Sequence, residues 1–228
     1  MGDVEESPKV DKTRYQRLVG KLIYLAHTRP DLAYAVSIVS QFMHDPRVRH
    51  LQAVDRILQY LKATPRRGLL FKRSEDLTME VYTDADYAGS ITDRRSTSGY
   101  CMFLGGNLVT WRSKKQNVVV HSSAEGEFRA MAQGICELLW MKIVLDDLKV
   151  TYKGSMELLC DNKSAITIAH NPVQHDRTKH IEIDRNFIKE KLDSGFITIA
   201  YVPSGYQLAD VLTKGLPSER FQELTSSY

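Results

Sequence analysis

The spacing of apolar residues changes once along the chain, and this change constrains the fold more than any other feature. Between residues 11 and 63, apolar side chains recur every three or four positions in three stretches, punctuated by Pro30, Pro46 and Pro65. This pattern predicts three packed helices with short connections. A polar turn follows at residues 72–76, and apolar runs of strand type begin at about Leu77.

The second part of the chain predicts a mixed sheet with helices. Gly105, Gly106 and Asn107 suit a tight turn between two strands. An antiparallel meander followed by alternating helices and strands favours an α/β (α+β mixed) fold. The predicted domains are therefore a helical segment at 1–74 and an α/β domain at 75–228. We expect strands at 77–84, 99–104, 108–111, 156–160 and 196–202, an extended run at 117–121, helices at 124–146, 162–170 and 181–192, and a last helix from about Gln207.

Charge and cysteine content restrict the class of protein. Lys and Arg total 31 against 28 Asp and Glu, and this net charge of +3 permits a nucleic-acid partner without demanding one. The three cysteines are far apart and form no Cys-x-x-Cys pair, which argues against a disulfide framework and against a thiolate zinc site. The sequence has neither an apolar run of transmembrane length nor a signal-peptide pattern, so we expect an intracellular protein without a membrane partner.

Four acidic residues indicate the chemistry. Asp84 closes a predicted strand, Glu127 lies early in the long helix, Asp161 follows a buried strand, and Asp210 lies early in the last helix. Carboxylates brought together at one sheet end would repel one another unless divalent cations neutralised them, which is the logic of a two-metal phosphodiester hydrolase. Three of these acids also have a structural alternative: a turn at Asp84, an N-cap at Asp161 and a helix-dipole charge at Asp210.

Two glutamates compete for the role in the long helix. Ser122 and Glu125 have the spacing of a capping box, so we expect Glu125 to cap the helix start. On a helical wheel, Glu127 lies about 60° from the centre of the apolar face and Glu125 about 100°. Glu127 is therefore the better candidate ligand.

Ordered motifs cover nearly the whole chain. They are 18–26 (LVGKLIYLA), 28–33 (TRPDLA), 57–62 (ILQYLK), 82–89 (YTDADYAG), 95–100 (RSTSGY), 110–116 (TWRSKKQ), 122–127 (SSAEGE), 160–165 (CDNKSA), 171–173 (NPV), 177–182 (RTKHIE) and 207–214 (QLADVLTK). The motifs between residues 82 and 214 resemble the ribonuclease H domain of copia-type LTR retrotransposon polyproteins. Those between 18 and 62 resemble the end (thumb or connection region) of the same family's reverse transcriptase.

The resemblance implies a ribonuclease H-like five-stranded mixed sheet flanked by helices, preceded by a small three-helix region. It also implies that Asp84, Glu127, Asp161 and Asp210 are the catalytic, metal-binding residues for two Mg²⁺ ions, with Mn²⁺ able to substitute. The activity would be hydrolysis of the RNA strand of RNA–DNA hybrids. The expected partners are the hybrid and the polymerase part of the same polyprotein, with no small-molecule substrate, in a cytoplasmic particle or the nucleus.

The sequence also departs from the family pattern. The polymerase motif Tyr-x-Asp-Asp is absent, so no polymerase activity is expected. The loop 203–207 lacks the His that many ribonucleases H carry before the last Asp, and Asn186 stands where family members often have His. A catalytically silent relic, or an adopted nucleic-acid-binding module, is therefore the alternative function.

Basic and aromatic residues near the predicted hairpin suggest substrate contacts. We expect phosphate contacts and stacking from Arg95, Trp111, Arg112, Lys114 and Lys115. A solvated basic face is the alternative. A hybrid would be recognised by its shape and its 2′-hydroxyls rather than by base sequence.

A zinc site is a further alternative, but a weak one. Three histidines recur at five-residue spacing, yet Pro172 prevents one regular helix and the spacing matches no usual zinc pattern. The histidines are His170, His175 and His180.

Overall fold

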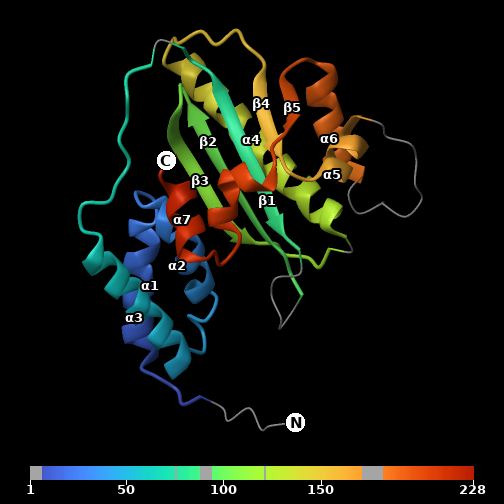
Figure 1. Ribbon diagram of the computed structural model, residues 1–228. Coiled ribbons are helices and arrows are strands. Elements are labelled where there is room, and N and C mark those ends of the chain that lie inside the picture. Colours follow the sequence, from blue (N-terminus) through green and yellow to red (C-terminus); the bar gives the residue numbers. More distant parts are fainter. Residues whose placement is uncertain (1–6, 75, 88–93, 121, 171–181) are drawn as a thin grey trace. The chain divides into compact units, whose positions relative to one another are not determined.

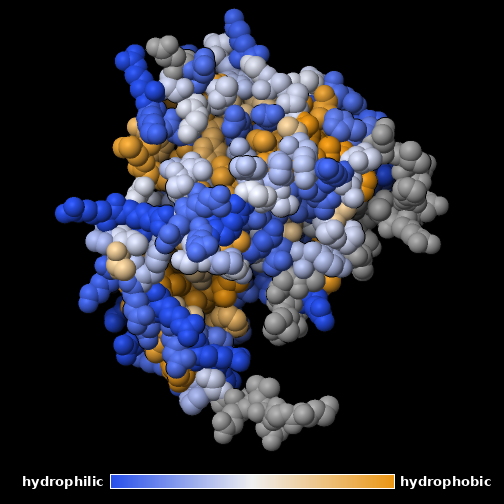
Figure 2. All heavy atoms as spheres, in the orientation of Figure 1, coloured by the Kyte–Doolittle hydropathy of each residue, from blue (hydrophilic) through white to orange (hydrophobic). Residues whose placement is uncertain are grey.

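The computed structural model describes residues 7–74, 76–87, 94–120, 122–170 and 182–228. They form two compact units, residues 1–69 and 70–228. The quoted motif at 171–173 and all of the motif at 177–182 except Glu182 lie outside the described residues, as do His175 and His180 of the zinc alternative. In the view of Figure 2, most of the described surface is hydrophilic, with smaller hydrophobic areas between. None of the described helices is both long and apolar enough to cross a membrane.

The first unit consists of the three predicted helices, α1 (Lys12–Leu25), α2 (Ala33–Ser40) and α3 (Val48–Ala63). Asp11 caps α1, because its side chain accepts hydrogen bonds from the backbone of the first turn. A short 3-10 helix, Pro30–Leu32, leads into α2. The apolar stripes of the three helices meet in one core, formed by Tyr15, Val19, Leu22, Leu32, Val36, Val39, Val54 and Ile57.

A buried ion pair reinforces this unit beside its apolar core. Arg29 donates to both carboxylate oxygens of Asp31, at 2.9 and 2.7 Å. The hydroxyl of Tyr60 on α3 donates to the same carboxylate at 2.8 Å. The connection before α2 is thereby tied to the end of α3.

The second unit is a five-stranded mixed sheet flanked by helices, as predicted (Figure 1). The strand order is β3-β2-β1-β4-β5. The first three strands form the antiparallel meander, whereas β4 runs parallel to β1 and β5 parallel to β4. The strands are β1 (Met79–Asp86), β2 (Thr97–Leu104), β3 (Asn107–Lys115), β4 (Met156–Cys160) and β5 (Ile197–Tyr201).

The long helix α4 (Ser123–Asp147) packs against β1 and β2 and builds the main core. Odd-numbered β1 residues such as Val81 and Thr83 face α4, since both lie within 3.4 Å of the Cβ position of Gly134. Asp84 therefore points to the other face of the sheet. There Gly99 of β2 meets a short 3-10 helix, Leu208–Leu212. The other helices among the described residues are α5 (Lys163–His170), α6 (Glu182–Asp193), α7 (Ser218–Thr225) and the 3-10 turn Ser204–Tyr206.

Three local predictions need correction. The last helix expected from Gln207 is a 3-10 helix at Leu208–Leu212 followed by α7, because Pro217 separates the two. The third strand continues to Lys115, four residues beyond its predicted end. Of the predicted extended run, Asn117 and Val118 form a bend, and Val119 and Val120 have no regular secondary structure.

Candidate metal centre

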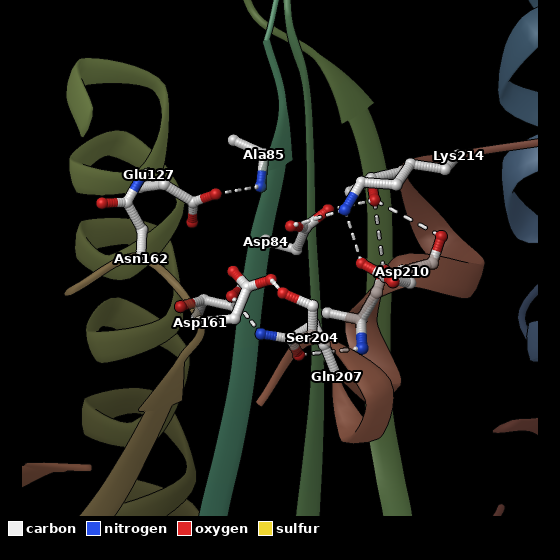
Figure 3. Close-up of polar contacts among 12 residues, drawn as sticks. Asp84, Ala85, Glu127, Asp161, Asn162, Ser204, Gln207, Asp210 and Lys214 are labelled. Atoms are coloured by element: carbon white, nitrogen blue, oxygen red, sulfur yellow. Dashed lines mark hydrogen bonds and ion pairs between the residues drawn. The ribbon is translucent and has the colours of Figure 1, made fainter. Parts of the chain in front are cut away.

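The fold brings the four predicted acids to one end of the sheet (Figure 3). Asp84 lies near the end of β1 and Asp161 directly after β4. Glu80 pairs with Glu157 and Tyr82 with Leu159 in the parallel β1–β4 ladder, so the same register places Asp84 level with Asp161. Glu127 comes from the start of α4, and Asp210 from the 3-10 helix.

The acids form two overlapping groups. In the first group, one carboxylate oxygen from each of Asp84, Asp161 and Asp210 lies within 4.8 Å of the other two. In the second group, one possible ligand atom from each of Glu127, Cys160 and Asp161 does the same. Asp161 therefore belongs to both groups. A set dominated by carboxylate oxygens suits a hard cation such as Mg²⁺ or Mn²⁺, and the first group contains oxygen ligands alone. The residues present thus fit the ions that the resemblance implies.

Asp84 is almost completely buried, with 1% of its surface exposed. One carboxylate oxygen accepts a hydrogen bond from the Thr213 hydroxyl, and the other accepts one from Lys214 Nζ at 3.2 Å. Burial raises the pKa of Asp84, and the Lys214 charge and the Thr213 hydrogen bond offset part of that rise. The pocket therefore holds a carboxylate that needs positive charge beside it.

Asp210 shares the same cation. Its carboxylate accepts from Lys214 Nζ at 2.6 Å. Burial raises the pKa of Asp210, and Lys214 opposes this rise. Burial lowers the pKa of Lys214, but the charges of Asp84 and Asp210 outweigh that effect and raise it overall. Lys214 is thus a charged ammonium that bridges two predicted ligands.

Glu127 is 4% exposed. Its Oε1 accepts from the Ala85 backbone N–H at 3.3 Å, and its Oε2 lies 3.8 Å from Cys160 Sγ. Burial, followed by the charges of Asp84 and Asp161, raises the pKa of Glu127 to about 9. Without added cations, this carboxyl is protonated at neutral pH.

The capping box predicted at Ser122 and Glu125 is confirmed for one of its two hydrogen bonds. The backbone N–H of Glu125 donates to the Ser122 hydroxyl at 3.2 Å, which is one half of a capping box. The Glu125 carboxylate is buried as well, and it pairs with Arg129 one turn later at 3.5 Å. Burial alone therefore does not separate the two glutamates; their partners do.

Asp161 does not cap the following helix. Asn162 does so, because its Oδ1 accepts from the backbone N–H of Ala165 at 3.0 Å. The N-cap alternative for Asp161 is wrong, and the Asp161 carboxylate instead accepts from the Ser204 hydroxyl at 2.7 Å. The helix-dipole alternative for Asp210 also loses its basis, since that residue lies in a five-residue 3-10 helix.

Four residues around the acids were not singled out from the sequence. Thr213, Lys214 and Ser204 contact the carboxylates directly. Gln207 is fully buried, and its side chain donates to the Thr83 carbonyl at 3.0 Å, which ties the loop carrying Asp210 to β1. The four-residue spacing of Asp210 and Lys214 was the one available signal, because it is typical of helical ion pairs.

The predicted nucleic-acid-binding residues are not all in one place. Arg112, Lys114 and Lys115 line a cavity of about 550 Å³ that also includes Arg129 of α4 and residues of α6. Trp111 alternates with Arg112 along β3, so it lies on the opposite face of the sheet. Arg95 is exposed before β2 and does not line this cavity.

Comparisons with known proteins identify the class. No protein-family model matches the chain. Its fold is similar to that of a foamy viral protease-reverse transcriptase solved with an RNA/DNA hybrid, with a TM-score of 0.57 and 14% identity over 93% of this chain and 27% of the other. With the strand order described above, the second unit is ribonuclease H-like, as the motifs implied.

Sequence relatives match most of the chain. The chain is 44% identical over 216 residues to the retrovirus-related Pol polyprotein from transposon RE1 of Arabidopsis thaliana, covering 95% of this chain and 15% of the relative. It is 37% identical over 220 residues to that from transposon TNT 1-94 of Nicotiana tabacum, covering 96% and 16%. Over nearly its whole length the chain is similar to the retrovirus-related Pol polyproteins of transposons, and it spans about one sixth of the length of these relatives.

Proposed function

We propose that this chain is the ribonuclease H of a retrotransposon Pol polyprotein, and that it hydrolyses the RNA strand of RNA–DNA hybrids by a two-metal mechanism. The observation that carries the proposal is the meeting of four acids from four separate elements at one sheet end. Three of them, Asp84, Glu127 and Asp210, are buried, and burial raises the pKa of each. Such a cluster is costly unless cations neutralise it, and sites that shift pKa values in this way are often functional.

Asp84, Asp161 and Asp210 would hold one Mg²⁺ ion, and Glu127 with Asp161 would hold the second. When bound, the two ions would activate the attacking water and stabilise the leaving 3′-oxygen. The chain's own polar groups orient the ligands: Thr213 fixes one oxygen of Asp84, and the hydrogen bond from Ser204 holds Asp161. The contact from the Ala85 N–H turns Glu127 toward β1.

Substrate binding would use the basic cavity beside β3. Arg112, Lys114 and Lys115 would contact phosphates there, while Arg95 and Trp111 would contact other parts of the hybrid. We further propose that residues 1–74 correspond to the end of the reverse transcriptase and 75–228 to the nuclease. The polymerase part of the same polyprotein would be the protein partner, in a cytoplasmic particle or the nucleus.

Cleavage of a labelled RNA–DNA hybrid in Mg²⁺ tests the proposal. The wild type should cut the RNA strand, while Asp84→Asn and Glu127→Gln should reduce the rate by at least about 100-fold. Glu125→Gln is the matched control, because it makes the same change two residues away in the same helix and should retain most activity. Circular dichroism verifies that each variant is folded.

Two results would contradict the proposed nuclease activity. Equal rates for the wild type and Asp84→Asn would assign the observed cleavage to a contaminant. Salt-sensitive binding of the hybrid without any cleavage would instead support the silent nucleic-acid-binding module.

A further inference from the structure

One cation already stands between two of the predicted ligands. Lys214 Nζ lies 3.2 Å from Asp84 Oδ1 and 2.6 Å from Asp210 Oδ1 (Figure 3). The Asp84 and Asp210 side chains are nearly buried, whereas the Lys214 side chain is 34% exposed. The lysine therefore reaches from the edge of the site into a place that solvent barely enters.

A divalent ion and this ammonium would compete for the same carboxylates. Asp84 and Asp210 are two of the three acids whose ligand atoms lie within 4.8 Å of one another. A cation that bound through the oxygens that Lys214 now contacts, Oδ1 of Asp84 and Oδ1 of Asp210, would take the place of the ammonium. The two positive charges would also repel one another at close range.

We infer that Lys214 is a resident counter-ion of this centre, which holds Asp84 and Asp210 together without metal and is displaced when a divalent ion binds there. The inference rests on the proposed function only insofar as these acids bind such an ion. Lys214 is a positioning residue in this scheme, because it acts through the two carboxylates.

Two features of the structure suit such an exchange. The side chain is long and partly exposed, so its ammonium can return to solvent without a change in the fold. The neighbouring Thr213 hydroxyl bonds to Asp84 independently, and Thr213 also packs against β2 at Gly99. The loop and the Asp84 carboxylate therefore keep their positions after Lys214 leaves.

Calorimetric titration of the full chain with Mn²⁺, in the absence of nucleic acid, tests the inference. Lys214→Gln removes the competing charge and should bind Mn²⁺ about tenfold more tightly than the wild type. The same variant should melt at a lower temperature in EDTA, because Asp84 and Asp210 then lack their counter-ion. Lys153→Gln, which removes an exposed lysine before β4, should change neither value. An unchanged or weaker Mn²⁺ affinity in Lys214→Gln, or an equal gain in Lys153→Gln, would overturn the inference.

A second measurement uses the wild type, so it does not depend on whether the variant folds. Acylation of lysines with an amine-reactive ester, followed by mass spectrometry, should modify Lys214 several-fold faster when Mn²⁺ is added, with Lys153 as the internal reference. Unchanged or slower modification of Lys214 would refute displacement. Neither experiment requires cleavage. If Mn²⁺ displaces Lys214 but the protein does not cleave hybrids, the proposed nuclease activity is refuted and the inference about Lys214 stands.

Discussion

Two glycines of α4 provide a sharp test of how the helix is seated on the sheet. A methyl group added at Gly134 would stand 2.6 Å from Thr83 Cγ2 and 3.4 Å from Val81 Cγ2 on β1. The same group at Gly126 would meet nothing closer than Ala85 Cβ at 3.4 Å, an ordinary contact. Replacement by alanine should therefore have opposite effects at two positions of one helix.

The magnitudes follow from two opposing terms. Replacing a helical glycine by alanine stabilises a helix by about 1 kcal/mol. At Gly134 the added methyl carbon would lie about 1 Å closer to Thr83 Cγ2 than a normal carbon–carbon contact allows, and the side chains around it are fully buried. Overpacking of this kind costs about 1–3 kcal/mol. Gly126→Ala should thus raise the free energy of unfolding by up to about 1 kcal/mol. The free energy of unfolding of Gly134→Ala should be about 1–3 kcal/mol lower than that of Gly126→Ala, because the gain in helix propensity is the same in both variants.

Urea unfolding followed by tryptophan fluorescence measures this difference. The two tryptophans, Trp111 on β3 and Trp140 on α4, both report on the second unit. Equal unfolding free energies for the two variants, or a more stable Gly134→Ala, would refute the close approach of α4 to β1. That approach also positions Glu127, so Gly134→Ala should lower hybrid cleavage as well.

Three further predictions concern charge and packing. Because burial raises the pKa of Glu127 from 4.5 to about 9, the folded protein binds the extra proton between these values. In EDTA its stability should fall as pH rises, by about 1.4 kcal/mol per pH unit for this group, and Glu127→Gln should show a flatter slope in urea melts from pH 5.5 to 8.5; an equally steep slope would contradict the assignment. Gly99→Ala would place a methyl group 2.7 Å from Thr213 Cγ2 and should weaken Mn²⁺ binding several-fold in calorimetry, since it pushes the Asp210 segment off β2. Asp31→Asn leaves Arg29 buried without its charge partner, so the helical unit should lose about 3–5 kcal/mol, measured by circular dichroism; full stability would rule out this ion pair as a support.

Local sequence signals predicted most of the secondary structure. The apolar stripes of residues 11–63 indicated three helices, and the glycines at 105 and 106 adopt the positive φ values that their hairpin turn requires. Ser122 accepts the predicted capping hydrogen bond. Errors arose where neighbouring residues compete for one local role, as Asp161 and Asn162 do for the helix cap.

The sequence by itself indicated the likeness to Pol polyproteins, the order of the elements and the four acids that the fold brings to one end of the sheet. These depend on residues a few positions apart and on motifs in a set order. Only the tertiary structure decided which groups meet. Lys214 contacts Asp84 across 130 positions of sequence, and the Ala85 N–H reaches Glu127 across 42. The pKa of Glu127 depends on its burial and on its distance from other charges, and the partners of Lys214 depend on which carboxylates lie near it. Burial and these distances exist only after the chain has folded.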